Sequence, residues 1–315
     1  MSNPRTRAAA RARRRGSGRI PLVSTGAPRA LSNTLGRVPE LPEMQALAER
    51  LHELLAGARF ERVEPLSFSA LKTVSPAPEL LPGKRLLSTG RRGKFLRLDV
   101  GDDLAVLIHL SQGGRIDLQP RSVTSKPKGG VVRFRFDRDP AVLVKEFGTE
   151  RKAGWWMLGP GDDGPLAKLG PDPFAPEFAE LVRTGSDTGR IHALLRDQRT
   201  VAGIGRGYSD DILHRAGLSP YRSLASLDEA ERERLLHAVH SVLTEALEAE
   251  RRRVGGLPPK LGDHFTVHGK YGTPCPVCGS DLRRVSYQSH EVTYCPRCQT
   301  GGKILADRRL SRLIR

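Results

Sequence analysis

The sequence predicts an α+β fold, in which one helix leads into a largely β-stranded region, followed by a helical region and a small metal-binding module. Three observations support this prediction. Apolar residues recur at helical spacing in residues 42–56, short strand-like runs fill residues 60–158, and four cysteines near the C-terminus form two Cys-x-x-Cys pairs. A chain of 315 residues is also long enough for two or three domains.

The first helix is expected from Pro42 to Ala56. Its apolar residues lie three and four positions apart, as on one face of a helix, and Gly57 follows as a stop. From Phe60 onwards the pattern changes to short apolar runs with Gly, Pro and Asp between them, which is typical of a sandwich or a barrel. The clearest strand candidates are residues 95–100, 104–110, 131–136 and 141–144.

The Pro- and Gly-rich stretch from Gly159 to Pro176 is predicted to be a linker, because the chain beyond it is helical. A glycine-rich segment, residues 201–207, separates two of the helices. It is either a tight turn between them or, because it opens a helix, a place where backbone N–H groups bind a phosphate. The expected helices cover residues 176–182, 189–196, 208–216 and 227–250.

The charge of the chain is strongly positive and unevenly distributed. Its 52 Lys and Arg against 35 Asp and Glu give a net charge of +17, which favours a polyanionic partner such as nucleic acid. Residues 1–37 contain nine arginines and no acidic residue, so they account for +9. Their composition predicts disorder, and a transit peptide, a DNA-binding arm and a tail without function all fit it. With 38% hydrophobic residues and no long apolar run, the chain can form packed cores but no membrane span.

All four cysteines belong to one motif. Two residues separate Cys275 from Cys278 and Cys295 from Cys298, and sixteen residues lie between the pairs. This spacing is typical of four thiolates around one Zn²⁺. Two disulfides or free thiols are the alternatives, but no secretory signal supports the oxidising compartment that disulfides need. A zinc ion held in this way is structural, because four thiolates leave no open position for water.

Four segments together resemble the formamidopyrimidine-DNA glycosylase/endonuclease VIII family. Residues 38–43 (Val-Pro-Glu-Leu-Pro-Glu) are similar to the family's N-terminus, and residues 91–96 (Arg-Arg-Gly-Lys-Phe-Leu) to its strand with a DNA-contacting lysine. Residues 195–210 resemble its helix–two-turn–helix, and residues 267–299 its zinc finger. The four segments occur in the family's order, which makes chance a poor explanation. The resemblance implies an N-terminal β-sandwich, a helix–two-turn–helix domain and a four-cysteine zinc finger.

The resemblance also sets the expected domain boundaries. They are a disordered basic tail at 1–37, a catalytic β-sandwich domain at 38–160, a helix–two-turn–helix domain at 174–254, a zinc finger at 260–301 and a basic C-terminal segment at 302–315.

In the family, the nucleophile is the secondary amine of an N-terminal proline. It attacks the sugar C1′, expels the damaged base and forms an iminium that permits strand cleavage by elimination. The resemblance assigns this role to Pro39, proton transfer at the sugar to Glu40, and a phosphate contact near the lesion to Lys94. Taken alone, Pro39 fits a helix-start proline and Lys94 a solvated charge. Glu43 either matches a further carboxylate of the motif or complements the helix dipole.

Pro39 meets a chemical obstacle in the chain as written, because its nitrogen is part of the peptide bond with Val38. A lone pair delocalised into an amide cannot attack a sugar. Val38 stands where the family has its initiator methionine, and a GUG codon there would be decoded as methionine at a translation start. We therefore expect residues 1–37 to be an artefact of start-site choice, with processing or a genuine tail as the alternatives.

The expected DNA contacts follow from the resemblance but depart from the family pattern in places. Gln112 replaces an apolar wedge and Ala153 stands where a Phe would intercalate, so specificity for oxidised purines is not implied. His290 falls near an arginine of the family's finger and is either a pH-sensitive contact or a solvated histidine. The residues expected to contact DNA are Arg91, Arg92, His109, Gln112, Arg115, Arg151, Gly203, Gly205, Arg206, Tyr208, Lys270 and His290.

The sequence thus predicts a bifunctional DNA glycosylase and AP lyase that acts on damaged bases or abasic sites by β- or β,δ-elimination. Its expected partner is duplex DNA, its cofactor one structural Zn²⁺, its state a monomer and its location the bacterial cytoplasm at the nucleoid. A non-catalytic zinc-finger protein that binds damaged or distorted DNA is the alternative. A zinc-ribbon RNA- or ribosome-associated protein also fits the charge and the cysteines, but it leaves residues 38–43 unexplained.

Overall fold

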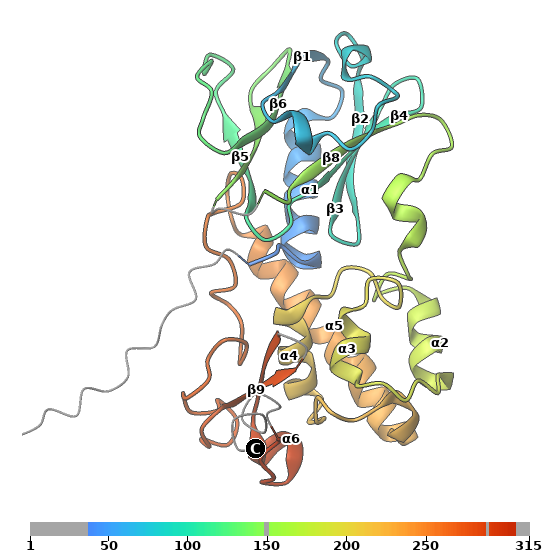
Figure 1. Cartoon of the computed structure of the whole chain (residues 1–315), viewed down its shortest axis with the longest axis vertical. Coiled ribbons are helices and arrows are strands. Elements are labelled where there is room, and N and C mark those ends of the chain that lie inside the picture. The colour runs from blue at the N-terminus through green and yellow to red at the C-terminus, as the bar shows by residue number, and fades with distance from the viewer. Residues whose placement is uncertain (1–36, 148–150, 288–289, 307–315) are drawn as a thin grey trace, which may run out of the picture. The chain divides into compact units, whose positions relative to one another are not determined.

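The computed structural model describes residues 37–147, 151–287 and 290–306. They belong to one unit, and its elements are coloured along the chain in Figure 1.

The N-terminal part is a sandwich of two antiparallel four-stranded sheets. The first sheet has the order β1-β6-β7-β5, formed by Phe60–Pro65, Gly130–Phe136, Ala141–Glu146 and Gly114–Gln119. The second has the order β2-β3-β4-β8, formed by Leu86–Arg92, Phe95–Val100, Leu104–His109 and Gly154–Leu158. Short 3₁₀ turns at Phe68–Ala70 and Pro78–Leu80 precede β2.

The sandwich core forms because side chains alternate across each strand. In β3 every second side chain, from Leu96 to Val100, is buried, as expected for a strand with one face on the core. Trp155 of β8 is fully buried, and its ring meets Phe134 of β6 edge-on at 5.7 Å, which joins the two sheets. Helix α1 (Leu41–Leu55) adds its apolar stripe to this core.

A helical domain follows the 3₁₀ turn Gly164–Lys168. Its helices are α2 (Pro176–Thr184), α3 (Ile191–Arg196), α4 (Arg206–Arg215) and α5 (Glu229–Arg251), with a 3₁₀ turn at Leu224–Ser226. The long helix α5 is capped by Asp228, whose side chain accepts the N–H of Glu231 at 2.7 Å. Figure 1 shows α5 beside α1, and Arg50 of α1 donates to the backbone carbonyl of Glu250 at 3.0 Å. The two domains are thus joined by α1 and α5.

The C-terminal module is a hairpin of β9 (Arg283–Tyr287) and β10 (His290–Tyr294), followed by α6 (Pro296–Thr300). It is fixed to α4 by two buried carboxylates. Asp211 accepts the backbone N–H groups of Thr266, Val267 and His268, and Asp210 accepts that of Thr293. Each bond satisfies a backbone donor that would otherwise be left unpaired.

The predicted α+β fold is therefore confirmed, and the element bounds differ from expectation by a few residues at most. Helix α1 begins at Leu41 rather than Pro42, and α4 begins two residues earlier than expected, at Arg206. Within the described residues, no helix has both the length and the apolar character needed to cross a membrane. The expected tail at 1–37 lies outside the described residues except for Arg37.

Candidate active site and DNA-binding surface

Glu40 is a buried, hydrogen-bonded carboxylate at the junction of the two domains. It precedes α1 and is 5% exposed, and its two oxygens accept the backbone N–H groups of Gly205 and Gly207, the latter at 2.9 Å. These donors lie at the start of α4, where the unpaired N–H groups and the helix dipole favour a negative charge. The glycine-rich turn therefore binds a carboxylate of the protein, which leaves the N–H of Gly205 unavailable to a DNA phosphate.

Gly205 has to be a glycine because two side chains lie directly over it. A Cβ at this position would stand 2.5 Å from Glu40 Oε1 and 2.6 Å from Lys94 Nζ. The same geometry shows that Glu40 and Lys94 share one small space. Gly203 adopts φ +113° and its N–H donates to Gln198, so this turn is also fixed from within.

Lys94 follows Gly93 in the turn between β2 and β3 and points its ammonium group toward Glu40. Burial lowers the pKa of Lys94, and the negative charge of Glu40 opposes this effect. His109, at the end of β4, has its pKa lowered to about 4 by burial and by the charge of Lys94. His109 is therefore a neutral imidazole at neutral pH, and Lys94 is the basic residue that shares the space over Gly205 with Glu40.

Pro39 is buried next to Glu40 at the start of α1, with its nitrogen in the peptide bond to Val38. Two residues before it, Arg37 places its guanidinium 5.1 Å from the centre of the Phe265 ring. Burial lowers the pKa of Arg37, although four carboxylates nearby raise it. In this form of the chain, Pro39 has the position of the expected nucleophile but lacks its free amine.

Glu43 forms a second buried carboxylate behind the first. It is 2% exposed, and its Oε2 accepts the backbone N–H of Glu40 at 3.0 Å while its Oε1 accepts the hydroxyl of Tyr208 at 2.9 Å. Burial, followed by the charges of Glu40 and Glu250, raises the pKa of Glu43 to about 7. This carboxyl group therefore exchanges its proton near neutral pH.

Several arginines that were expected to contact DNA are committed inside the protein. Arg115 is 1% exposed, and its three guanidinium nitrogens donate to backbone carbonyls, among them Pro258 and Pro259. Arg91 pairs with Asp172 at 2.7 Å, and Arg92 donates to the carbonyl of Gly170 at 2.6 Å. The expectation of DNA contacts does not fit these environments, because each group is already neutralised or hydrogen-bonded within the fold.

Tyr208 is also buried, at 1% exposed, so it supports Glu43 rather than facing a ligand. By contrast, Arg206 at the start of α4, Arg151 and Lys270 are exposed, and Gln112 is partly exposed. The side chain of His290 lies outside the described part of the chain.

Two further candidate site residues, Arg196 and Phe147, were not among those predicted from the sequence. Arg196 ends α3, and its pKa is lowered by burial and by the nearby positive charge of Arg206. Phe147 follows β7 and is 42% exposed, and its N–H donates to the carbonyl of Gly113, next to Gln112. Arg196 could have been found as an arginine at the end of an apolar helix, but no periodic signal marks Phe147.

The four cysteines converge as their spacing predicts. Their sulfurs lie within 4.8 Å of one another, with Cys275 Sγ 3.9 Å from Cys298 Sγ and Cys278 Sγ 3.4 Å from Cys295 Sγ. Tetrahedral ligands about 2.3 Å from a zinc ion stand roughly 3.8 Å apart, so the four thiolates fit Zn²⁺. His214 lies 3.2 Å from Cys275 Sγ and supports the site from α4. No cysteine of this cluster forms a disulfide.

The start of α4 in the helical domain binds Glu40 of the N-terminal part, and the four-cysteine module is attached to the same helix. Together, these features define a helix–two-turn–helix DNA glycosylase fold. Comparison with known proteins agrees. The formamidopyrimidine-DNA glycosylase N-terminal domain matches residues 38–156, and the formamidopyrimidine-DNA glycosylase H2TH domain matches residues 169–255. The chain belongs to the formamidopyrimidine-DNA glycosylase family.

Individual relatives support this assignment. The formamidopyrimidine-DNA glycosylase of Thermus thermophilus is 33% identical over 277 residues, covering 84% of this chain and all of the relative. An uncharacterized formamidopyrimidine-DNA glycosylase-like protein of Mycobacterium tuberculosis is 44% identical over 152 residues, covering 47% of this chain and 94% of the relative. Among solved structures, the Thermus thermophilus MutM protein has a TM-score of 0.71 at 29% identity, covering 84% of this chain and all of that chain. A Lactococcus lactis Fpg mutant in complex with Fapy-dG containing DNA has a TM-score of 0.72 at 25% identity, covering 83% and 100%.

Proposed function

We propose that this protein is a base-excision repair enzyme, a DNA glycosylase with AP lyase activity that acts on duplex DNA carrying a damaged base or an abasic site. One observation carries the proposal beyond family membership. Glu40 and Lys94 both lie over Gly205 at the junction of the sandwich and the helical domain, and Pro39 is the buried residue that precedes Glu40 in the chain. We therefore assign the roles of nucleophile, proton-transfer carboxylate and phosphate-binding cation to Pro39, Glu40 and Lys94.

The chemistry of these groups follows from their surroundings. A free Pro39 is a secondary amine with a pKa near 8, so a useful fraction is unprotonated at neutral pH. Its lone pair forms a bond to C1′ while the bond from C1′ to the base, or to the hydroxyl of an abasic site, breaks. The nitrogen then loses its proton, and its lone pair forms the iminium as the C1′–O4′ bond breaks and O4′ takes up a proton. The iminium acidifies the C2′ proton, and loss of that proton expels the 3′ phosphate. Glu40, held by two N–H groups, is placed to move protons at the sugar, and Lys94 to bind a phosphate.

We propose that duplex DNA is bound by the exposed and half-buried cations around this point. Arg206 and Arg196 lie at the start of α4 and the end of α3, and Lys270 lies in the segment before the cysteine motif. Such groups fix the phosphate backbone rather than read bases. We propose that the domain at 38–160 carries out catalysis and that the domains at 174–254 and 260–301 bind DNA. The protein would act as a monomer.

The four cysteines would hold one Zn²⁺ that orders the hairpin. Bound there, the ion supplies only structural stabilisation, because all four positions are thiolates. Asp210 binds Thr293 of the hairpin and Asp211 binds Val267 in the segment before it, so that α4 keeps Lys270 at a constant position relative to Arg206.

Borohydride trapping on duplex DNA with an abasic site tests the proposal, using the full chain beside a form whose first residue is Pro39. We expect a covalent adduct with the shortened form and none with the full chain, because only a free amine gives a reducible imine. Glu40→Gln should reduce the rate of trapping, and Pro39→Gly is a poor control because glycine also supplies an amine. Absence of an adduct with the shortened form would overturn the lyase assignment.

A second function is favoured by one specific observation, the peptide bond between Val38 and Pro39. A chain that keeps this bond would be a non-catalytic protein that binds damaged or distorted DNA through the same scaffold. The mass of the natively expressed protein distinguishes the two: a species that begins at Pro39 supports the enzyme, and one that begins at Met1 supports the binding protein.

A further inference from the structure

In one row of side chains, two hydrogen bonds join Glu43 to His264 through Tyr208, and His264 in turn lies next to carboxylates at the protein surface. Glu43 Oε1 lies 2.9 Å from the hydroxyl of Tyr208, and this hydroxyl lies 2.7 Å from Nε2 of His264. On the other side of its ring, His264 Nδ1 lies 3.7 Å from Asp263 Oδ1 and 3.6 Å from Glu250 Oε1. The Asp263 side chain is 67% exposed, so the row begins at a buried carboxyl group and ends in solvent.

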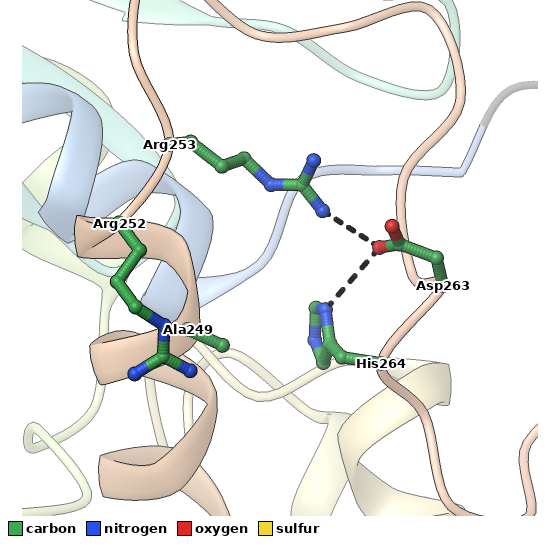
Figure 2. A pocket seen from close by; sticks show the side chains of 5 residues that line it. All are labelled: Ala249, Arg252, Arg253, Asp263 and His264. Atoms are coloured by element: carbon green, nitrogen blue, oxygen red, sulfur yellow. Dashed lines mark hydrogen bonds and ion pairs between the residues drawn. The ribbon is translucent and has the colours of Figure 1, made fainter.

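The outer end of the row opens into a surface groove of about 330 Å³. Figure 2 shows His264 at this groove, joined by a dashed line to Asp263, which in turn contacts Arg253. At the inner end, Glu43 and Tyr208 are almost fully buried. Among the described residues, His264 Nδ1 has no hydrogen-bond partner within the protein, although the atom itself is covered. A nitrogen in this position can pass a proton to the groove after a small movement.

The Tyr208 hydroxyl has one proton for two partners. In one arrangement a protonated Glu43 donates to Tyr208, Tyr208 donates to Nε2, and the His264 proton is on Nδ1. In the other, Tyr208 donates to an ionised Glu43, and Nε2 carries the proton and donates to Tyr208. When the first arrangement changes to the second, the Glu43 proton moves to Tyr208, the Tyr208 proton moves to Nε2 of His264, and the proton on Nδ1 is released. Glu43 is then ionised and can accept a new proton.

The inference rests on the proposed function, because the row needs a proton to carry. The Pro39 amine, when it is protonated, must lose a proton before its lone pair can attack C1′. Glu43 accepts the backbone N–H of Glu40, one residue from Pro39. We propose that Glu43 takes this proton from the Pro39 nitrogen and that Tyr208 and His264 conduct it to solvent at the groove. The N–H bond breaks, the nitrogen keeps the electron pair for C1′, and the proton leaves through Nδ1 of His264.

Other properties of the row agree with this role. A group that takes a proton works best when its pKa is near the working pH, and burial raises the pKa of Glu43 to about 7. The groups that face His264 are Glu43 from α1, Tyr208 from α4, Glu250 with Arg252 and Arg253 from α5 and its end, and its neighbour Asp263.

A metal ion is a weaker interpretation of the same cluster. Ligand atoms of Glu43, Glu250 and His264 lie within 4.8 Å of one another. However, His264 faces Glu43 with Nε2 and Glu250 with Nδ1, so its two nitrogens point to different carboxylates. Glu250 is also paired with Arg253 at 2.9 Å, which already neutralises its charge. The geometry suits a bridge between two carboxyl groups rather than a shared ion.

The test is the rate of imine trapping on an abasic duplex in a single turnover, measured from about pH 5.5 to 9 with the form that begins at Pro39. His264→Gln keeps a hydrogen-bonding group opposite Tyr208 but cannot conduct a proton. We expect its trapping rate to fall on the order of tenfold near pH 6.5 and to approach that of the unaltered protein near pH 9, where solvent removes the proton. The dissociation constant for duplex DNA should stay within about twofold.

Two further variants separate proton conduction from a structural effect. Tyr208→Phe interrupts the same row, so the double variant with His264→Gln should be no slower than the slower single variant. In His264→Ala, imidazoles added to the solution should restore the rate, and more basic ones should restore it more. His240→Gln on α5, whose ring contacts only Phe174 among the described aromatic rings, is the matched control and should leave the pH profile unchanged.

The outcomes distinguish the two proposals. If the unaltered form traps DNA and His264→Gln has the same pH profile, the relay is wrong and the proposed function stands. Multiplicative effects in the double variant, or rescue that ignores the basicity of the imidazole, would likewise refute the relay. If the unaltered form gives no adduct at any pH, the proposed function fails and the relay fails with it.

Discussion

Replacement of Gly205 by alanine tests whether the glycine-rich turn positions Glu40 for the proton transfer that we propose. A Cβ there would lie 2.5 Å from Glu40 Oε1 and 2.6 Å from Lys94 Nζ. Non-bonded heavy atoms rest at about 3.5 Å or more, so the carboxylate or the turn has to move by roughly 1 Å. Such a shift weakens the N–H bonds from Gly205 and Gly207, each of which contributes about 1.5–3 kcal/mol because the acceptor is charged.

A displacement of this size at a reacting centre costs on the order of 100-fold in rate. We therefore expect Gly205→Ala to lower the single-turnover rate of borohydride trapping about 100-fold, in the form that begins at Pro39. Overpacking should cost about 1–3 kcal/mol of folding stability, which lowers the melting temperature by several degrees without unfolding the protein at about 25 °C.

Gly90→Ala provides the control, because its added Cβ would meet nothing within 4 Å and its φ is not in the left-handed region. This variant should keep the unaltered trapping rate. If Gly205→Ala traps DNA at more than about one-third of the unaltered rate, then the turn does not position Glu40 and our account of the site is wrong.

Three further predictions concern separate parts of the molecule. Burial raises the pKa of Glu43 to about 7, so the folded state keeps a proton that the unfolded chain loses. The free energy of unfolding should therefore fall by about 2 kcal/mol as the pH rises from about 5.5 to 7. Urea unfolding should show this slope, and Glu43→Gln should remove it. Cys298→Ser should reduce bound zinc, measured by mass spectrometry, from one ion per chain to less than one. DNA binding should weaken at least about tenfold. The sandwich and the helical domain should stay folded, because each has its own core. Phe147→Ala should weaken binding to an abasic duplex about tenfold without changing the melting temperature, because an exposed aromatic ring can stack on a base but adds little to the core; equal binding by the variant would contradict this.

The fold was largely readable from the sequence because its signals are local. Helical spacing marked α1 within one residue of its start, and alternation marked β3 at its observed bounds, Phe95–Val100. The cysteine spacing alone predicted the convergence of four sulfurs that the structure shows. In the helix and the strand, the spacing of the apolar residues follows directly from the geometry of the element.

The details of the site were less predictable because they depend on contacts between distant segments. Glu40 binds N–H groups 165 and 167 residues away, and Tyr208 meets His264 across 56 residues. The sequence offered the glycine-rich turn as a phosphate site or a tight turn, and nothing local could show that the carboxylate preceding α1 fills it. The partners of Arg91, Arg92 and Arg115 within the protein were not predictable for the same reason, because a guanidinium inside a domain junction looks the same in a sequence as one on the surface.

The buried arginines change what the positive charge means. Residues 38–315 carry a net +8, which the sequence associated with DNA. Arg91 pairs with Asp172 at 2.7 Å, and Arg115 donates its hydrogen bonds to backbone carbonyls. These groups hold the sandwich to the segments around it, and the same junction brings Glu40 to the start of α4. Part of the charge is therefore engaged in contacts within the protein, and Glu40 has the hydrogen bonds from Gly205 and Gly207 only when the sandwich and the helical domain are docked.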